Sequence, residues 1–161
     1  MEVKFLSPVP HGIRDQDVHG SGAFLASRVG RVHYGVDIIC VPGEQVVSPC
    51  NGILVRRKRP YGQDLHWSGV LIATEGGIQI TLFYLEPNSA LYGHEVTKGQ
   101  VIGTAQDISQ KYPGIIPHIH MEVVWPRDRS LPNEWRRGHE YVVRSGANRG
   151  IYVNPLLLIG D

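Results

Sequence analysis

Short apolar runs that are rich in β-branched residues and bounded by glycine limit most strongly what this chain can fold into. The segments GILVRRK and GVLIATE have this form, and no stretch keeps a helical period over about 11 residues. The 19 glycines and 11 prolines are spread along the chain and punctuate these runs. The pattern predicts an all-β fold, an antiparallel β-sandwich in which one sheet packs on a smaller one. We expect strands at residues 36–40, 45–48, 52–57, 69–74, 78–85, 101–105 and 118–124.

The length of 161 residues suits one domain, since a chain of this size buries roughly 68–70% of its unfolded surface. We expect a single domain over residues 1–161, with a loop-rich region at 1–29, a hairpin insertion at 125–152 and a closing segment at 153–161. The formal net charge of +1 gives no global argument for nucleic-acid binding, and we expect none. No apolar run approaches the roughly 20 residues of a membrane span, and we expect a monomer without one.

Four side chains in two short motifs form the one constellation in the sequence that carries chemistry. His33 and Asp37 lie in HYGVD, and His118 and His120 lie in HIH much later in the chain. Residues an even number apart project from the same face of an extended strand, so each pair can point into one site. Two imidazoles and one carboxylate are sufficient protein ligands for a catalytic zinc, and they leave a fourth position for water.

Each motif also has an ordinary structural interpretation. An H-x-x-x-D match arises by chance in many chains with eight histidines, where the histidine is solvated or satisfied in the core. The H-x-H pair is more telling, because two histidines on one face of the apolar run IIPHIHMEVV need polar partners or a metal to offset their desolvation. Together the two motifs favour a metal site.

The segments around these motifs carry a family resemblance. RVHYGVDI, GEQVVSPCNGILV, VTKGQVIGTA, PHIHMEVV and VNPLLLI occur in this order, and the chain thereby resembles the lysostaphin and LytM type zinc endopeptidases. It is most similar in pattern to the leukocyte cell-derived chemotaxin group, zinc-binding relatives that are not regarded as peptidases. The match extends from about residue 17 to 124, with a short echo at 153–159. The resemblance implies an open groove on a β-sandwich with one zinc on its floor.

The resemblance also implies roles for the four side chains. His33, Asp37 and His120 would be the zinc ligands, and His118 the catalytic histidine beside them. Zinc would acidify a bound water toward a pKa of about 7 and polarise the scissile carbonyl. His118 would move the proton or stabilise the developing oxyanion.

One position departs from the enzymes. They carry a second catalytic histidine in a T-x-Y-x-H-L pattern, and the segment TLFYLEP has Leu85 at that place. If Leu85 lies on the groove face, catalysis is slow or absent and Leu85→His raises it. His66 and His94 are candidates to replace the missing group from loops, although each has an ordinary interpretation as a surface histidine.

Aromatic and basic residues add candidates for substrate binding. His66, Trp67, Trp125 and Trp135 are candidate contacts, and the segment after the H-x-H strand either forms one wall of the groove or packs its aromatics, Tyr141 among them, on the core. Basic residues could form a rim that attracts anionic polymers, or they could simply be solvated. They are Arg56, Arg57, Lys58, Arg59, Arg127, Arg129, Arg136, Arg137, Arg144 and Arg149.

Three functions remain open. The first is a zinc endopeptidase that cuts peptide cross-links of bacterial peptidoglycan, and the second is a zinc-stabilised binding module that cleaves nothing. The third is a lipoyl- or biotinyl-type carrier, which VVSPCNGILV and VTKGQVIG echo, but it lacks the modified lysine and explains no histidine. The first residues do not form a secretory signal, so action outside the cytoplasm would require a secretion machine, lysis or a viral tail. We expect Cys40 and Cys50 to be reduced core residues.

Overall fold

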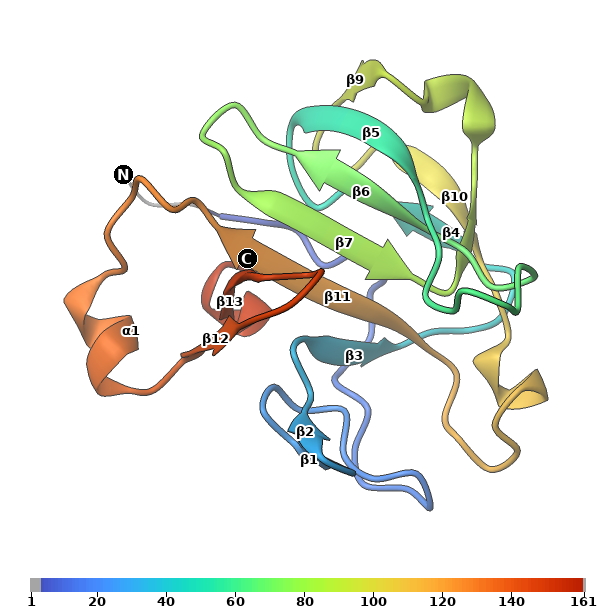
Figure 1. Cartoon of the computed structure of the whole chain (residues 1–161). Helices are drawn as coiled ribbons and strands as arrows, with labels where there is room; N and C mark the ends of the chain where they lie inside the picture. The colour runs from blue at the N-terminus through green and yellow to red at the C-terminus, as the bar shows by residue number, and fades with distance from the viewer. Residues whose placement is uncertain (1–3, 161) are drawn as a thin grey trace.

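The computed structural model describes residues 4–160, and nearly all of its regular structure is β-strand (Figure 1). The larger sheet has the strand order β12-β13-β11-β7-β6-β5-β9, and β3 also pairs with β11. All its strand pairs are antiparallel, which confirms the predicted all-β antiparallel fold. Its strands are β3 (Val36–Ile39), β5 (Gly52–Lys58), β6 (Gly69–Ala73), β7 (Gln79–Phe83), β9 (His94–Val96), β11 (His118–Trp125), β12 (Tyr141–Arg144) and β13 (Gly150–Val153).

A smaller sheet, a hairpin and a few short helices complete the described chain. The smaller sheet has the order β4-β10-β8, and β1 pairs with β2. None of the helices in residues 4–160 is long and apolar enough to cross a membrane. These elements are β1 (Ser27–Arg28), β2 (Arg31–Val32), β4 (Gln45–Val47), β8 (Leu85–Pro87), β10 (Val101–Ala105), α1 (Asn133–Arg137) and the 3₁₀ turns η1 (Ser89–Leu91), η2 (Ile108–Gln110) and η3 (Pro155–Leu157).

Strand β11 divides the molecule into a core side and a polar side. Its odd-numbered residues Ile119, Met121 and Val123 are fully buried in the main core. Its even-numbered residues include His118 and His120, which therefore face the opposite side of the sheet. The strict alternation of a strand thus separates the apolar face from the face that carries the two histidines.

The close contact between β3 and β11 depends on Gly35, which lies directly before β3. A Cβ atom at this position would be 2.2 Å from the carbonyl oxygen of Met121 and 3.0 Å from Cγ of Glu122. Only glycine allows the two backbones to approach this closely. With β3 in this place, Asp37 stands directly opposite His120 in the strand register.

The expected strand at 78–85 is interrupted at Tyr84, and this changes the position of Leu85. Tyr84 has a φ of +74°, so β7 ends at Phe83 and a separate strand, β8, begins at Leu85 in the smaller sheet. In an unbroken strand Leu85 would share a face with Phe83. Instead Leu85 is fully buried in the main core, where its side chain lies close to Gly103. The condition on which Leu85 would affect catalysis, a place on the groove face, is therefore not met.

The segment after β11 divides its residues between the core and the polar side. Trp125 packs edge-on against Trp135 of α1 with ring centroids 5.0 Å apart, and both belong to the main core or lie against it, as does Tyr141. The β12–β13 hairpin then returns beside β11 (Figure 1). Trp125 at the end of β11, Trp135 of α1 and Tyr141 of β12 thus pack on the core, while Arg144 at the end of β12 reaches the polar side.

Candidate metal centre

Three side chains from the two predicted motifs come together on the polar face of β3 and β11. The potential ligand atoms of His33, Asp37 and His120 all lie within 4.8 Å of one another, and all three residues are buried. Nε2 of His33 is 3.1 Å from Nδ1 of His120 and 3.2 Å from Oδ1 of Asp37. Nδ1 of His120 is 2.8 Å from the same carboxylate oxygen.

These separations fit a small tetrahedral metal ion. Zinc bonds of about 2.0–2.1 Å in tetrahedral geometry place neighbouring ligand atoms roughly 3.3 Å apart. The three observed separations, 2.8, 3.1 and 3.2 Å, are close to that value. Two imidazole nitrogens and one carboxylate oxygen also form a donor set typical of zinc. The site therefore suits one zinc ion held by three protein ligands.

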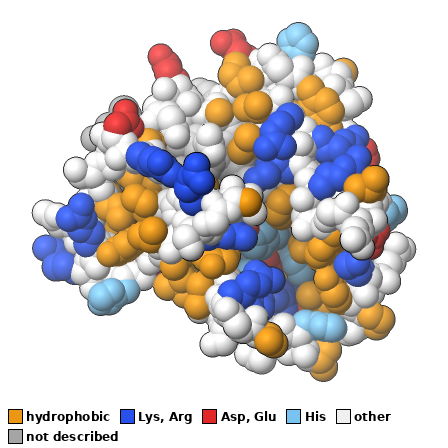
Figure 2. Space-filling model, viewed as in Figure 1, with side chains coloured by type: hydrophobic (Ala, Val, Ile, Leu, Met, Phe, Trp, Pro, Cys, Tyr) orange, Lys and Arg blue, Asp and Glu red, His pale blue; other side chains and the backbone are white. Residues whose placement is uncertain are grey.

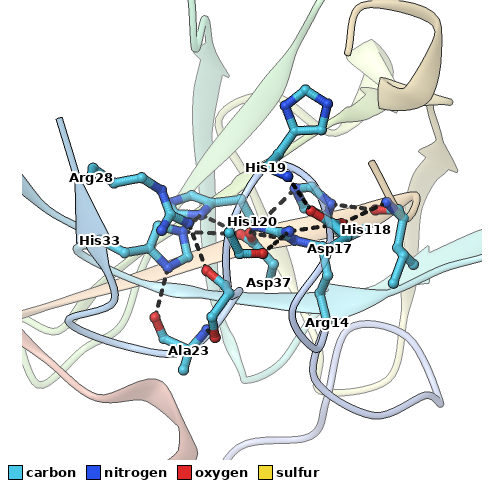
Figure 3. Close-up of polar contacts among 12 residues, drawn as sticks. Arg14, Asp17, His19, Ala23, Arg28, His33, Asp37, His118 and His120 are labelled. Atoms are coloured by element: carbon cyan, nitrogen blue, oxygen red, sulfur yellow. Dashed lines mark hydrogen bonds and ion pairs between the residues drawn. The ribbon is translucent and has the colours of Figure 1, made fainter. Parts of the chain in front are cut away.

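His33 is oriented by a carbonyl group of the preceding loop. It lies between β2 and β3 and not on a strand, so the expectation that it shares a strand with Asp37 is wrong. Its Nδ1 donates a hydrogen bond to the carbonyl oxygen of Ala23 at 2.9 Å, and its Nε2 is directed toward the other two ligands (Figure 3). A fixed partner for the second ring nitrogen selects the tautomer that binds metal.

Glu122 orients His120 in the same way. Nε2 of His120 is 2.9 Å from Oε1 of Glu122, two residues along the same face of β11. Burial acts against a charged ring, but hydrogen bonds to Asp37 and Glu122 more than offset it and raise the pKa of His120 to about 9 without metal. The two carboxylates thus hold a proton on this ring until a cation displaces it.

A buried arginine donates hydrogen bonds to the second carboxylate oxygen of Asp37. Arg14 is only 2% exposed, and its Nε and Nη2 donate to Oδ2 of Asp37 at 3.1 and 3.0 Å. Its Nη1 also contacts Asp17 at 2.9 Å and donates to the carbonyl of Gly20 at 2.8 Å. Despite burial, hydrogen bonds from His120 and His33 hold the pKa of Asp37 well below its usual value. Oδ1 alone remains for a metal, so Arg14 restricts Asp37 to one bond.

His118 stands beside the three potential ligands without joining them. Its Nδ1 donates to the carbonyl of Ile116 at 2.7 Å, and its Nε2 is 3.5 Å from Oδ2 of Asp37. Burial lowers its pKa, so the ring is neutral at physiological pH with Nε2 free to accept a proton. The ring of Tyr84 meets it edge-on at 5.3 Å between centroids.

A groove of about 510 Å³ opens above these side chains. Figure 2 shows it as a hollow with histidines inside and basic side chains around it. Phe83 and Tyr84 line it from the β7 end, and Tyr34 and Tyr152 line it from the opposite side. The potential ligands are therefore accessible to an extended molecule that lies along the sheet.

Several residues predicted to contact a substrate lie outside this groove. His66 is exposed and Trp67 belongs to a small separate core cluster, while Trp125 and Trp135 border a different cavity. None of the four lines the groove, so their expected place beside the site is wrong. His94 is exposed on β9 and does not line it either. The additional histidine that does line it is His19, whose Nε2 donates to the carbonyl of Pro113 at 2.9 Å.

Sequence reasoning missed three residues of the site. Glu122 could have been found, because it continues the alternation of His118 and His120 along the strand. The contact of Tyr84 with His118 was not predicted, because residues 78–85 were expected to form one unbroken strand. Arg14 has no sequence signal, since it reaches Asp37 from a loop whose path no local pattern predicts.

Comparisons with known proteins agree with this geometry. A family model described as peptidase family M23 matches residues 31–132. Leukocyte cell-derived chemotaxin-2 from Bos taurus is 34% identical over 110 residues, which cover 68% of this chain and 72% of that protein.

Solved structures share the fold at low sequence identity. A zinc-containing peptidase from Vibrio cholerae superposes with a TM-score of 0.53 at 24% identity, over 76% of this chain and 37% of that one. The antimicrobial peptidase lysostaphin from Staphylococcus simulans gives a TM-score of 0.51 at 20% identity, over 78% of this chain and 50% of that one. The chain thus spans half or less of these two solved chains.

Proposed function

Because the chain belongs to peptidase family M23, we propose that it is a zinc-dependent endopeptidase that hydrolyses peptide cross-links of bacterial peptidoglycan. One observation carries the proposal: three donor atoms lie at the separations of a zinc tetrahedron, and the groove leaves the fourth side open. The choice of substrate is supported by lysostaphin, an antimicrobial peptidase with the same fold. Such a substrate requires that the protein act outside the cytoplasm.

Different residues would bind the metal, transfer the proton and position the substrate. His33, Asp37 and His120 would hold the zinc ion, which supplies Lewis acidity toward the carbonyl of the scissile bond. His118, neutral and with Nε2 free, would accept a proton during attack and return it to the leaving amine. Phe83 and Tyr84 on one side and Tyr34 and Tyr152 on the other would position the peptide across the site.

A second candidate is a zinc-stabilised binding module that cleaves nothing. It is favoured by the 34% identity to leukocyte cell-derived chemotaxin-2 and by Tyr84, which lies against His118 where a second proton-transferring histidine would be useful. A tyrosine hydroxyl can donate a hydrogen bond, but its pKa, raised by burial to about 12, makes it a poor base near neutral pH.

Digestion of purified peptidoglycan separates the two functions. The zinc-loaded protein should release new amino termini, and His118→Ala should slow this release by about 10²–10⁴-fold while zinc occupancy is unchanged. His94→Ala is the matched control, because His94 is exposed and outside the groove. Full zinc occupancy without any release would favour the binding module, and loss of activity in His94→Ala would contradict the assignment of the groove.

A further inference from the structure

The groove gathers positive charge out of proportion to the rest of the chain. The whole sequence is nearly balanced, with 16 Lys and Arg against 15 Asp and Glu. Around the groove there are six Lys and Arg but only two carboxylates, those of Asp37 and Glu122. The excess is therefore local, and a bound divalent cation would increase it further.

The two groove carboxylates are already engaged by their immediate neighbours. Asp37 contacts Arg14 and the two potential histidine ligands, and Glu122 accepts from His120. Neither carboxylate lies within ion-pair distance of any of the other five cations. Within residues 4–160, in fact, no acidic group forms an ion pair with these five, which are Arg28, Arg31, Lys58, Arg59 and Arg144.

Neutral groups hold several of these cations in place. The guanidinium of Arg28 donates to the carbonyls of Ser27 and Ser21 at 3.1 and 2.9 Å. Lys58 donates to the hydroxyl of Thr81 at 3.1 Å. Arg144 lies 4.2 Å from the ring centroid of Tyr34. Carbonyls, hydroxyls and aromatic rings orient a cation without neutralising it, so the charge remains available to a ligand.

The cations stand on different walls of the groove. Arg28 and Arg31 belong to the β1–β2 hairpin, Lys58 and Arg59 lie at the end of β5, and Arg144 ends β12, elements that Figure 1 labels. The candidate metal centre lies between these elements on the groove floor. A cleft lined with one sign of charge focuses the field and concentrates ligands of the opposite sign.

We propose that the groove selects peptides that carry carboxylate side chains on both sides of the bond presented to the metal centre. That the ligand is a peptide rests on the proposed function, and what is new here is that the peptide is negatively charged. A peptide also fits better than nucleic acid, since the excess charge is confined to the groove and the chain as a whole carries a net charge of only +1.

Equilibrium binding tests the inference apart from catalysis. The probes are the capped hexapeptide Ac-Ala-Glu-Gly-Gly-Glu-Ala-NH₂ and its amide counterpart with Gln in place of both Glu. At low ionic strength the acidic peptide should bind the zinc-loaded protein at least about tenfold more tightly, and added salt should reduce the difference. The metal-free protein should keep part of this preference, because the five cations do not depend on zinc.

Variants from opposite walls identify the residues responsible. Arg31→Gln and Lys58→Gln should each reduce the preference for the acidic peptide about threefold or more, and Arg31→Glu should reduce it further. Arg137→Gln is the matched control, since Arg137 is exposed on α1 and lines neither groove wall. Melting temperatures equal to the wild type would show that Arg31→Gln and Lys58→Gln remain folded.

Three results would overturn the inference. Equal affinity for the two peptides at low salt would show that the charge is not used, and an equal loss in Arg137→Gln would show a non-specific effect. Tighter binding of a single-stranded oligonucleotide of the same charge would assign the groove to nucleic acid. If neutral peptides are cleaved as fast as acidic ones, this inference is contradicted and the proposed function is not. If nothing is cleaved but the acidic peptide still binds more tightly, only the proposed function is contradicted.

Discussion

Substitution of Gly35 by alanine probes the close contact on which the candidate metal centre depends. The added Cβ would lie 2.2 Å from the carbonyl oxygen of Met121, which is 0.8 Å less than the 3.0 Å below which such contacts essentially never occur. Gly35 is not among the glycines with a positive φ, so the expected effect is steric. The obstacle is a backbone atom of β11, so β3 has to move away from the strand that carries His118 and His120.

The displacement should appear both in stability and in metal affinity. Forcing extra atoms into a packed region destabilises by about 1–3 kcal/mol, and a clash with backbone belongs at the upper end. A loss of about 3 kcal/mol corresponds to a melting temperature lowered by roughly 6–12 °C in a chain of this size. Because Asp37 moves with β3, zinc affinity should fall by about tenfold or more.

Thermal denaturation and zinc titration check this reasoning together. Gly62→Ala is the control, because no atom lies within 4 Å of its added Cβ and its φ is not positive. That variant should match the wild type or be up to about 1 kcal/mol more stable. If Gly35→Ala melts with the wild type and binds zinc equally well, then the contact between β3 and β11 is not what holds the centre together.

Burial and charge lead to four further predictions. The protein should bind one zinc, and Asp37→Ala should abolish binding, as metal analysis will show. Without metal, His120 has a pKa of about 9 and carries a proton near neutral pH, and zinc has to displace that proton. Zinc affinity should therefore rise with pH up to about 9. Calorimetry in two buffers at pH 7 should detect the released proton. Leu85→His should lower the melting temperature by several degrees and should not speed cleavage, because Leu85 is fully buried in the core and not in the groove. Faster cleavage would contradict this placement. Burial raises the pKa of Cys40 to about 12 and that of Cys50 to about 11, so iodoacetamide at pH 8 should modify neither thiol until the protein unfolds.

The strands and the metal motifs could be predicted because each rests on a local periodicity. The seven expected strands are present, and their starts agree within one residue of the prediction. The alternation of His118 and His120 places both on the polar face of β11. Short-range patterns of this kind survive folding, because burial of one strand face enforces them.

Other features depend on geometry that no local pattern encodes. The positive φ of Tyr84 belongs to a residue type that seldom adopts it, so the break between β7 and β8 had no signal and the expected strand at 78–85 was continued through it. Trp125 and Trp135 were plausible groove contacts by sequence position alone, but their place in the core depends on how α1 folds back. Arg14 illustrates a third limit, since its loop approaches Asp37 only in the folded chain.

The edge of β11 that does not pair with β7 pairs with β3 along its first half and with β13 along its second half. One wall of the groove can therefore be varied separately from the candidate metal centre. β3 pairs with residues 118–121, which carry His118 and His120, and β13 pairs only with residues 123–125. The chain between these last residues and β13 supplies Arg144 and Asn148 to the groove wall without taking part in the register of the first half. Sequence libraries confined to residues 144–149, which leave the core contacts of Trp135 and Tyr141 in place, would therefore vary this wall of the groove while His33, Asp37 and His120 stay unchanged beneath it.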